Sequence, residues 1–338
     1  MLWLQFLACA ALITYTGAKL SRYADKISEI TGLGHTWIGV VLLASVTSLP
    51  ELITGTTAVA LHQLPDIAAG DVLGSCMINI AIIAALDFIY RKEPILASGD
   101  RAHILNAAFG IALLAVANIS LLLGNRVPSI GWIGIYTPIL LAGYLLAVRM
   151  LFRMESGRDS ETESGDEAEA TRRASRKRVY LGFSIHALMI IAAATWLPKV
   201  GERIAEQTGL EQSFVGTLFI AWSTSLPEFV VTFTALRHGA VHLALGNLFG
   251  SNTFNLAILA IEDIAYTKGP LLEAVSRSHS VSSNAAILMT AIAVVGLVTR
   301  SKSQKLGFGL ASIMLFIVYA SGTAISYMMG LGSAEESQ

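Results

Sequence analysis

The stretch TSLPE occurs twice in this chain, at Thr47 to Glu51 and at Thr224 to Glu228. Both copies lie in the middle of a long apolar run. A proline removes a backbone hydrogen-bond donor from a helix, and a carboxylate at the centre of a bilayer costs at least about 2.5 kcal/mol. A chain that places both groups there twice indicates a functional site built from two equivalent halves.

The composition around this stretch is that of a membrane protein. Of 338 residues, 54% are hydrophobic and 14% are charged, whereas about 25% of a soluble domain is usually charged. The first apolar run has no basic residues before it and is too long for a signal peptide, so we expect it to be retained. Runs of about 20 residues, the length that crosses a bilayer, recur along the chain. They predict ten spans, near 2–19, 37–61, 69–89, 102–123, 130–152, 179–197, 213–237, 244–264, 279–299 and 305–328.

The two TSLPE copies belong to an internal repeat. Residues 28–51 align with 205–228 at a constant offset of 177, and 11 of the 24 positions are identical. After a slip of one residue, 70–96 align with 246–272 at an offset of 176. The chain is therefore expected to contain two copies of one five-span unit.

This repeat predicts an all-α membrane protein in which the second unit crosses the membrane in the opposite sense, because five is odd. Helices broken near the midplane are expected at the two TSLPE copies. The predicted organisation is a first five-helix unit at 1–152 with its repeat core near 37–89, a charged linker at 153–178, a second five-helix unit at 179–328 with its core near 213–264, and a short polar tail at 329–338.

Charge distribution predicts the orientation. The odd-numbered loops hold 18 of the 23 Lys and Arg residues and the even-numbered loops with the C-terminus hold 5, so the positive-inside rule places both termini outside and the linker in the cytoplasm. We expect a multi-pass protein of the plasma membrane, the inner membrane in a prokaryote. The linker, acids followed by bases, is typical of a disordered or loosely helical tether. A second interpretation is that its basic residues contact anionic lipid headgroups.

Glu51 and Glu228 each fall near the middle of a predicted span. No Lys or Arg occurs at that depth in any predicted span, so the expected countercharge is a mobile cation or protons. Pro50 and Pro227 are expected to free backbone carbonyls just before the glutamates, and such oxygens are ligands that hard cations such as Ca²⁺ and Na⁺ prefer.

Neutral oxygen donors accompany each glutamate in the same pattern. Two hydroxyls lie three and four residues before it, where helical spacing directs them to its face, and a serine and an asparagine four residues apart follow in the next span. Each such residue alone more often bonds its own helix or packs against another. The same set in both units predicts an oxygen cage in which the two glutamates supply the charge of −2. Its neutral donors are Thr47, Ser48, Ser75 and Asn79 with Thr224, Ser225, Ser251 and Asn255.

Several other residues are better explained by structure than by transport. The glycine pairs at small-xxx-small spacing predict close helix packing, and Cys76 is expected to pack as well. Asp71 is interpreted as a helix N-cap, with a role at the mouth of the site as the alternative. Two aspartates at span ends are interpreted as interfacial anchors, and two histidines as interfacial residues with pH sensing as the alternative. These residues are Gly70, Gly74, Gly246 and Gly250, Asp87 and Asp263, and His103 and His279.

The doubled TSLPE, each followed by a GSNxFN-type segment, resembles the alpha-repeats of the cation/calcium exchanger superfamily, most of all prokaryotic sodium/calcium exchanger homologues. The resemblance implies that Glu51 and Glu228 are the central Ca²⁺ ligands. It also implies exchange by alternating access, with spans 1 and 6 sliding over the core. The remaining roles that it implies are Ca²⁺ ligation by Thr47 and Ala44 with Thr224 and Ala221, outer Na⁺ sites at Ser75 and Ser251, and a lining of the centre by Asn79 and Asn255.

Some positions depart from the family pattern. Val46 and Ser223 replace the usual glycine, the first copy reads GSC and GD in place of GSN and GN, and neither Asn79 nor Asn255 is an aspartate. The last departure leaves the counter-ion open between Na⁺ and H⁺.

The predicted function is a secondary antiporter that exchanges Ca²⁺ for Na⁺. The alternatives are a Ca²⁺/H⁺ or other cation/H⁺ exchanger on the same fold and, less favoured, a cation channel. No motif of an intramembrane enzyme occurs, so we expect no catalysis and no cofactor. The expected partners are Ca²⁺, a monovalent cation and the lipid bilayer, without nucleic acid. The oligomeric state is left open, with a monomer as one option.

Overall fold

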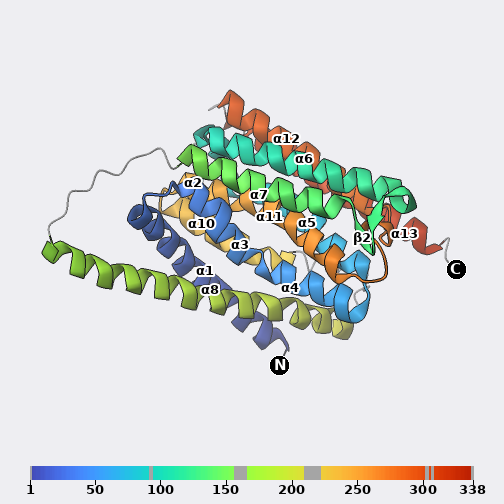
Figure 1. Cartoon of the computed structure of the whole chain (residues 1–338), viewed down its shortest axis with the longest axis horizontal. Coiled ribbons are helices and arrows are strands. Elements are labelled where there is room, and N and C mark those ends of the chain that lie inside the picture. Colours follow the sequence, from blue (N-terminus) through green and yellow to red (C-terminus); the bar gives the residue numbers. More distant parts are fainter. Residues whose placement is uncertain are drawn as a thin grey trace.

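The computed structural model describes residues 2–90, 94–155, 166–208, 222–300, 304–305 and 308–335. Nearly all of them are helical, and the long helices lie roughly alongside one another in one elongated bundle (Figure 1). Two central helices, α5 (Pro65–Tyr90) and α11 (Val241–Ala265), pack against each other. They carry the second half of each repeat core, so the two sequence repeats meet in the middle of the molecule.

The remaining long helices surround this centre. On one side, α1 (Leu2–Thr31) packs along α8 (Asp166–Thr208), and this pair also contacts α10 (Leu226–Arg237) and α4 (Leu49–Thr57) (Figure 1). The opposite side is formed by helices that pack on α5 and α11, namely α6 (Arg101–Leu123), α7 (Tyr136–Glu155), α12 (His279–Thr299) and α13 (Leu310–Glu335). Short 3₁₀ turns, η3 (Ile95–Ser98), η4 (Gly124–Arg126) and η5 (Leu271–Glu273), join these elements.

Seven of the described helical segments are long and apolar enough to cross a bilayer. They are His35–His62, Pro65–Ile89, Arg101–Arg126, Tyr136–Met154, Arg176–Leu197, Val241–Ala265 and His279–Thr299, and a shorter apolar helix runs over Leu310–Ser326. The predicted span at 2–19 lies within α1, which continues to Thr31, and part of the span at 213–237 lies outside the described residues. The all-helical membrane fold is confirmed, and the count of ten spans stays a prediction.

Two predicted spans begin later than the sequence indicated. Residues 130–135 belong to a hairpin of β1 (Ser129–Ile130) and β2 (Ile133–Gly134), so α7 starts at Tyr136. The hairpin turns at Gly131, whose φ of +65° is a left-handed conformation that favours glycine. In the second unit, β3 (Gln304–Lys305) and β4 (Phe308–Gly309) precede α13 in the same way. Apolar composition alone does not distinguish such a hairpin from the first turn of a span.

Asp87 and Asp263 attach these hairpins to the bundle, and the prediction that they are interfacial anchors was wrong. Both are buried. Asp263 accepts hydrogen bonds from the backbone N–H groups of Gly134 and Leu271 and from two hydroxyls, those of Tyr136 and Thr137. Asp87 accepts the equivalent bonds of the other unit, from the N–H groups of Ile95 and Gly309 and the hydroxyl of Ser312. Each aspartate therefore ties the end of its own helix to the hairpin of the other unit.

Close packing of glycine is observed where the first broken span crosses α11. A Cβ atom on Gly250 would lie 2.5 Å from the Cα of Val40, and one on Gly246 would lie 2.8 Å from the carbonyl of Thr36. Gly39 on the facing segment is equally confined, since its Cβ would lie 2.6 Å from the carbonyl of Leu243. The expected packing role of Gly246 and Gly250 is confirmed, and these contacts fix the position of the site residues on both segments.

Candidate ion-binding site

The first TSLPE copy is a break within one long helical segment. It runs through α2 (His35–Trp37), the π-helix η1 (Ile38–Leu43), α3 (Ala44–Thr47), α4 and the π-helix η2 (Ala58–His62). Ser48 leaves the helical conformation, with φ −93° and ψ 8°, and α4 begins at Leu49. Because Pro50 has no N–H, it cannot donate to the carbonyl of Val46. π-helical turns are frequent at functional sites.

The second copy has the same local structure. Ser225 has φ −82° and ψ 3°, and α10 begins at Leu226 with Pro227 in its first turn. Glu51 and Glu228 consequently lie in the first turns of α4 and α10. The exposed N–H groups at a helix N-terminus favour negative charge. Each glutamate is therefore held at the start of a new helix in the interior of the bundle, as the doubled motif predicted.

Hydroxyl groups connect the two units across the site. The Ser48 hydroxyl donates to Glu228 Oε1 at 2.9 Å, and the Ser75 hydroxyl donates to Glu51 Oε1 at 3.5 Å. Ser225 in turn donates to the hydroxyl oxygen of Ser75 at 3.1 Å. Helical spacing had predicted that Ser48 and Ser225 face the glutamate of their own unit. That prediction was wrong because both serines occupy the break, where helical periodicity no longer applies.

The two threonines of the motif also bond to the opposite unit. Thr224 donates to Asp71 Oδ1 at 3.0 Å, and Thr47 donates to Asn247 Oδ1 at 3.4 Å. Asp71 and Asn247 are equivalent positions of the repeat, 176 residues apart. The interpretation of Asp71 as an N-cap was wrong, because α5 begins at Pro65 and Asp71 is buried within the helix. Asp71 is thus a third carboxylate next to the site.

Several oxygen atoms of the site have unused acceptor capacity. Glu51 and Glu228 are fully buried and their charges act on each other. Among the described residues no Lys, Arg or His forms an ion pair with either of them. In and next to the site, the side-chain oxygens that are buried without a hydrogen-bond partner among the described residues include Glu51 Oε2, Glu228 Oε2, Asp71 Oδ2, Asn79 Oδ1, Ser251 Oγ and Asn255 Oδ1. Carboxylate, amide and hydroxyl oxygens are the ligands of hard cations.

The family resemblance also implied the carbonyls of Ala44 and Ala221 as ligands. The Ala44 carbonyl accepts the Ser48 N–H at 3.0 Å and the Thr47 hydroxyl at 3.3 Å. It therefore retains its helical hydrogen bond beside the break. Ala221 lies outside the described residues.

One buried acid of the core escaped the sequence analysis. Glu262 on α11 is fully buried, and neither of its carboxylate oxygens has a hydrogen-bond partner among the described residues. The predicted site residues were those that occur in both repeats. Glu262 does not, because the equivalent position, 176 residues earlier, is Leu86. An acid inside the predicted span at 244–264 was the signal that could have identified it.

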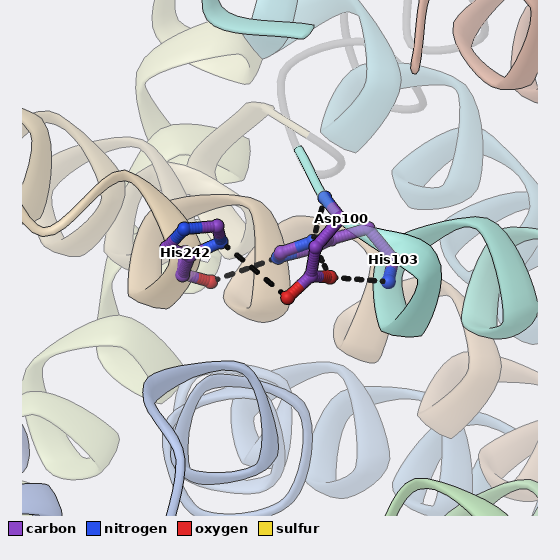
Figure 2. Close-up of side chains that lie close together, drawn as sticks. All are labelled: Asp100, His103 and His242. Carbon is purple, nitrogen blue, oxygen red and sulfur yellow. Dashed lines mark hydrogen bonds and ion pairs between the residues drawn. The ribbon is translucent and has the colours of Figure 1, made fainter. Parts of the chain in front are cut away.

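A second polar cluster lies where α6 and α11 begin (Figure 2). Asp100 caps α6 by accepting the N–H groups of Ala102 and His103, while its own N–H donates to His103 Nδ1. His103 Nε2 donates to the carbonyl of His242 at 3.1 Å, and His242 Nδ1 lies 3.7 Å from the Asp100 carboxylate. His103 is fully buried within the protein, and its expected place at a membrane interface stays a prediction.

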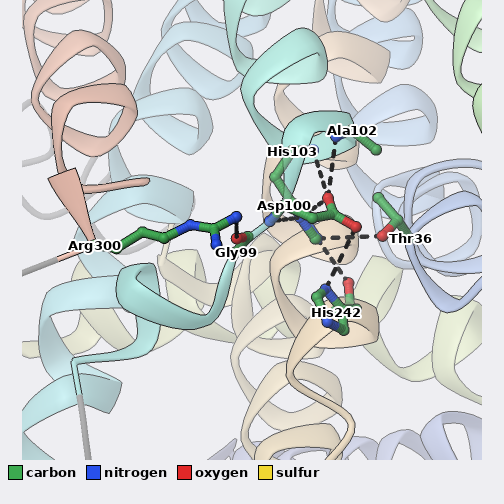
Figure 3. A network of polar contacts seen from close by, with 7 residues as sticks. All are labelled: Thr36, Gly99, Asp100, Ala102, His103, His242 and Arg300. Carbon is green, nitrogen blue, oxygen red and sulfur yellow. Dashed lines mark hydrogen bonds and ion pairs between the residues drawn. The ribbon is translucent and has the colours of Figure 1, made fainter. Parts of the chain in front are cut away.

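This cluster joins the first unit to the second. Thr36 and Arg300 extend it, since the Thr36 hydroxyl lies 3.5 Å from His103 Nε2 and Arg300 donates to the Gly99 carbonyl (Figure 3). One potential ligand atom each from Asp100, His103 and His242 lies within 4.8 Å of the other two, a spacing that could hold a metal ion. The observed cap and inter-unit bonds already account for the Asp100 and His103 contacts, so we assign the cluster a structural role.

Replacing Asp100 by Ala is expected to lower the free energy of unfolding by about 1–2 kcal/mol, the usual cost of losing an N-cap. Burial opposes ionisation of Asp100, but its hydrogen bonds with His103 outweigh burial and hold the pKa of Asp100 well below its ordinary value. A depressed carboxyl pKa stabilises the fold above its unfolded pKa, about 3.9, and the contribution is lost as pH falls through the folded pKa. Thermal unfolding of the purified protein in detergent, at neutral pH and at acidic pH, measures the effect.

Asp100→Asn is the matched control, because asparagine caps helices about as well as aspartate but has no charge. We expect it to retain the cap contribution and to lose the pH-dependent one. Equal unfolding temperatures for Asp100→Ala and the unmodified protein at neutral pH would contradict the assigned role.

Comparisons with known proteins show which family and which fold this chain resembles. The family profile described as sodium/calcium exchanger protein matches residues 1–152 and 178–324. The inner membrane protein YrbG of Escherichia coli is 28% identical over 314 residues, which cover 91% of this chain and 92% of YrbG. The sodium/calcium exchanger MaX1 of Methanosarcina acetivorans is 38% identical over 78 residues, 23% of this chain and 22% of MaX1. A structure of the sodium-calcium exchanger NCX_Mj has the same fold, with a TM-score of 0.74 and 19% identity over 96% of this chain and 99% of NCX_Mj.

Proposed function

This chain belongs to the sodium/calcium exchanger family, and on that premise we propose that it is a secondary antiporter that exchanges Ca²⁺ for Na⁺ at a site between Glu51 and Glu228. One observation carries the proposal. Two fully buried glutamates, on helices that begin at the same motif in inverted units, each have an unpartnered oxygen and no basic partner among the described residues. A chain that buries two such charges is expected to bring in the countercharge as transported cations.

The ligands that we propose are the two glutamates with the neutral oxygens around them. Ser48 and Ser75 already contact the glutamates, and Ser225 contacts Ser75. Asn79, Ser251 and Asn255 have unused oxygens in the same buried core. We include Thr47 and Thr224, whose hydroxyls cross between the units, and the carbonyls of Ala44 and Ala221, the latter on the family resemblance alone.

Obligatory exchange follows from the charge of this site. Two carboxylates neutralise one Ca²⁺, two Na⁺ or two H⁺, so occupancy by one kind of ion excludes the other. An empty site would leave two negative charges buried with no partner, which makes the change of access without an ion unfavourable. We propose that α1 and α8, which lie side by side against the repeat core (Figure 1), slide during that change.

The proposed orientation follows from the distribution of Lys and Arg, with both termini outside and the 153–178 linker in the cytoplasm. On that orientation the Asp100 cluster lies on the cytoplasmic side, and the ends of α4 and α11 lie on the outer side.

A gradient experiment tests the counter-ion. The purified full chain in proteoliposomes is expected to take up radioactive calcium when Na⁺ is loaded inside and pH is clamped, because Na⁺ leaving the site makes room for Ca²⁺. Liposomes with equal Na⁺ on both sides and empty liposomes are the controls. Uptake driven by a pH gradient alone would replace the Na⁺ proposal by Ca²⁺/H⁺ exchange, the second candidate, which the asparagines at 79 and 255 leave open. Uptake at full rate with no counter-ion inside would indicate a channel.

A further inference from the structure

Glu262 is a buried acid to which the proposed exchange site gives no role. It lies on α11, three residues before the end of the helix, and is fully inaccessible to solvent. Both carboxylate oxygens lack a hydrogen-bond partner among the described residues. An ionised carboxylate in this environment would cost several kcal/mol, so a neutral acid is strongly favoured.

The carboxyl group of Glu262 packs against a glycine. A Cβ atom built on Gly55 would lie 1.7 Å from Glu262 Oε1, so the carboxyl group fills the space that a side chain would otherwise occupy. The Cβ of Ala68 lies 3.6 Å from that built atom. A proton satisfies a buried acid without requiring any further ligand, whereas a hard metal cation requires several oxygen ligands.

Glu262 also continues a series of acids that starts at the exchange site. The charge of Asp71 acts on both Glu51 and Glu262. Gly55, which contacts Glu262, lies one helical turn beyond Glu51 on α4. Among the described titratable groups, Asp71 on α5 is the one whose charge acts on Glu262, and His62 at the end of η2 is exposed to solvent. Rows of acids within membrane spans are typical of proton pathways.

The inverted repeat provides an internal comparison. The positions equivalent to Glu262, Gly55 and Asp71 are Leu86, Thr232 and Asn247. There the Asn247 amide donates to the Thr232 hydroxyl at 3.1 Å, and a leucine replaces the acid. The fold is thus compatible with an apolar, uncharged version of the same packing. The acids at 71 and 262 are a feature of one half of the molecule and are not required by its architecture.

We propose that Glu262 is a proton-binding site, separate from the central glutamates, between Asp71 and the membrane face at which α11 ends. This inference rests on the proposed function, because it places the proton of Glu262 on the route by which ions reach the exchange site. Burial is the main reason that Glu262 is neutral, and the charge of Asp71 adds to it. A cation that arrives at Glu51 and Asp71 offsets that charge and so lowers the free-energy cost of ionising Glu262. Glu262 then releases its proton to the solution on that side, and it takes the proton back when the cation has left.

Proton release on Ca²⁺ binding tests the proposal. Ca²⁺ is added to the purified full chain in weakly buffered detergent solution, and a pH indicator reports the protons released per Ca²⁺ bound. Glu262→Gln and Glu262→Leu are each expected to release about one proton fewer than the unmodified protein, since the linked group is gone. Because proton release and Ca²⁺ binding are coupled, both variants are also expected to bind Ca²⁺ about tenfold more weakly. The leucine variant reproduces the packing of the first unit, so folding is expected to survive. Infrared difference spectra should lose a protonated carboxyl band in both variants.

Glu273→Gln is the matched control, because Glu273 is an exposed acid on η5, close in sequence to Glu262, and it should release as many protons as the unmodified protein. Equal proton release in the unmodified protein and both Glu262 variants, with Ca²⁺ still bound, would overturn the inference and leave the exchange site intact. If instead the proposed exchange site were wrong, the Glu51→Gln variant would still bind Ca²⁺.

Discussion

Glu51→Gln and Glu228→Gln are each expected to abolish exchange. Either substitution keeps the shape of the side chain but removes one of the two charges that neutralise a divalent ion. The loss of one charge partner in a buried site costs about 3 kcal/mol or more, which corresponds to at least about a 100-fold weaker affinity for Ca²⁺. Calcium uptake by proteoliposomes under a counter-ion gradient, together with calorimetric Ca²⁺ titration in detergent, measures both effects.

Controls separate this loss from misfolding. Glu273→Gln removes an acid that is exposed and is expected to leave uptake unchanged. Both site variants are expected to unfold at or above the temperature of the unmodified protein, because they remove the repulsion between two buried carboxylates. Full exchange activity in either variant would remove Glu51 and Glu228 from the centre of the site.

The architecture was largely predictable because it depends on features that the sequence repeats. Two aligned units with an odd number of spans predict an inverted arrangement. The matched Pro50 and Pro227 predicted breaks in the interior, and both breaks are present. The burial of Glu51 and Glu228 followed from their position in apolar runs. Periodicity and composition predict spans, helix breaks and burial well, because these features depend on residues within one helix.

The partners within the site were less predictable, because they join residues that are far apart in the chain. Ser48 bonds to Glu228 and Thr224 bonds to Asp71, and no local spacing encodes a contact between units. The helical-face argument failed at Ser48 since the helix ends there. Glu262 was missed for the opposite reason: a search guided by the repeat finds what both units share, and Leu86 occupies the equivalent position.

The same limit explains the error on Asp87 and Asp263. Both lie near span ends, where an aspartate is usually solvated, and the sequence gives no sign of the hairpins that cover them. In the structure each carboxylate lies near the end of a helix of one unit and accepts a hydrogen bond from the hairpin of the other. The two units are therefore locked together at their far ends by buried hydrogen bonds and in the middle by the exchange site.

Asp263→Ala is expected to have the largest effect on folding, because this carboxylate satisfies four donors. Its Oδ2 accepts from Gly134 N and Thr137 Oγ1, and its Oδ1 accepts from Leu271 N and the Tyr136 hydroxyl. Each buried donor left without an acceptor costs about 1–3 kcal/mol. A loss of at least about 4 kcal/mol follows, which should appear as poor membrane expression and a strongly lowered unfolding temperature in detergent.

Two further variants show whether the hydrogen bonds are the cause. In Asp263→Asn one oxygen is replaced by an NH₂ group, which cannot accept, so about half of the donors stay satisfied and an intermediate loss is expected. Asp87→Ala removes an acceptor for three donors and should destabilise less than Asp263→Ala. If Asp263→Ala unfolded at the temperature of the unmodified protein, the attachment of the hairpins to the bundle would have to come from apolar packing alone. The order of the unfolding temperatures of the three variants therefore shows how much the buried hydrogen bonds of Asp263 and Asp87 contribute to holding the two inverted units together.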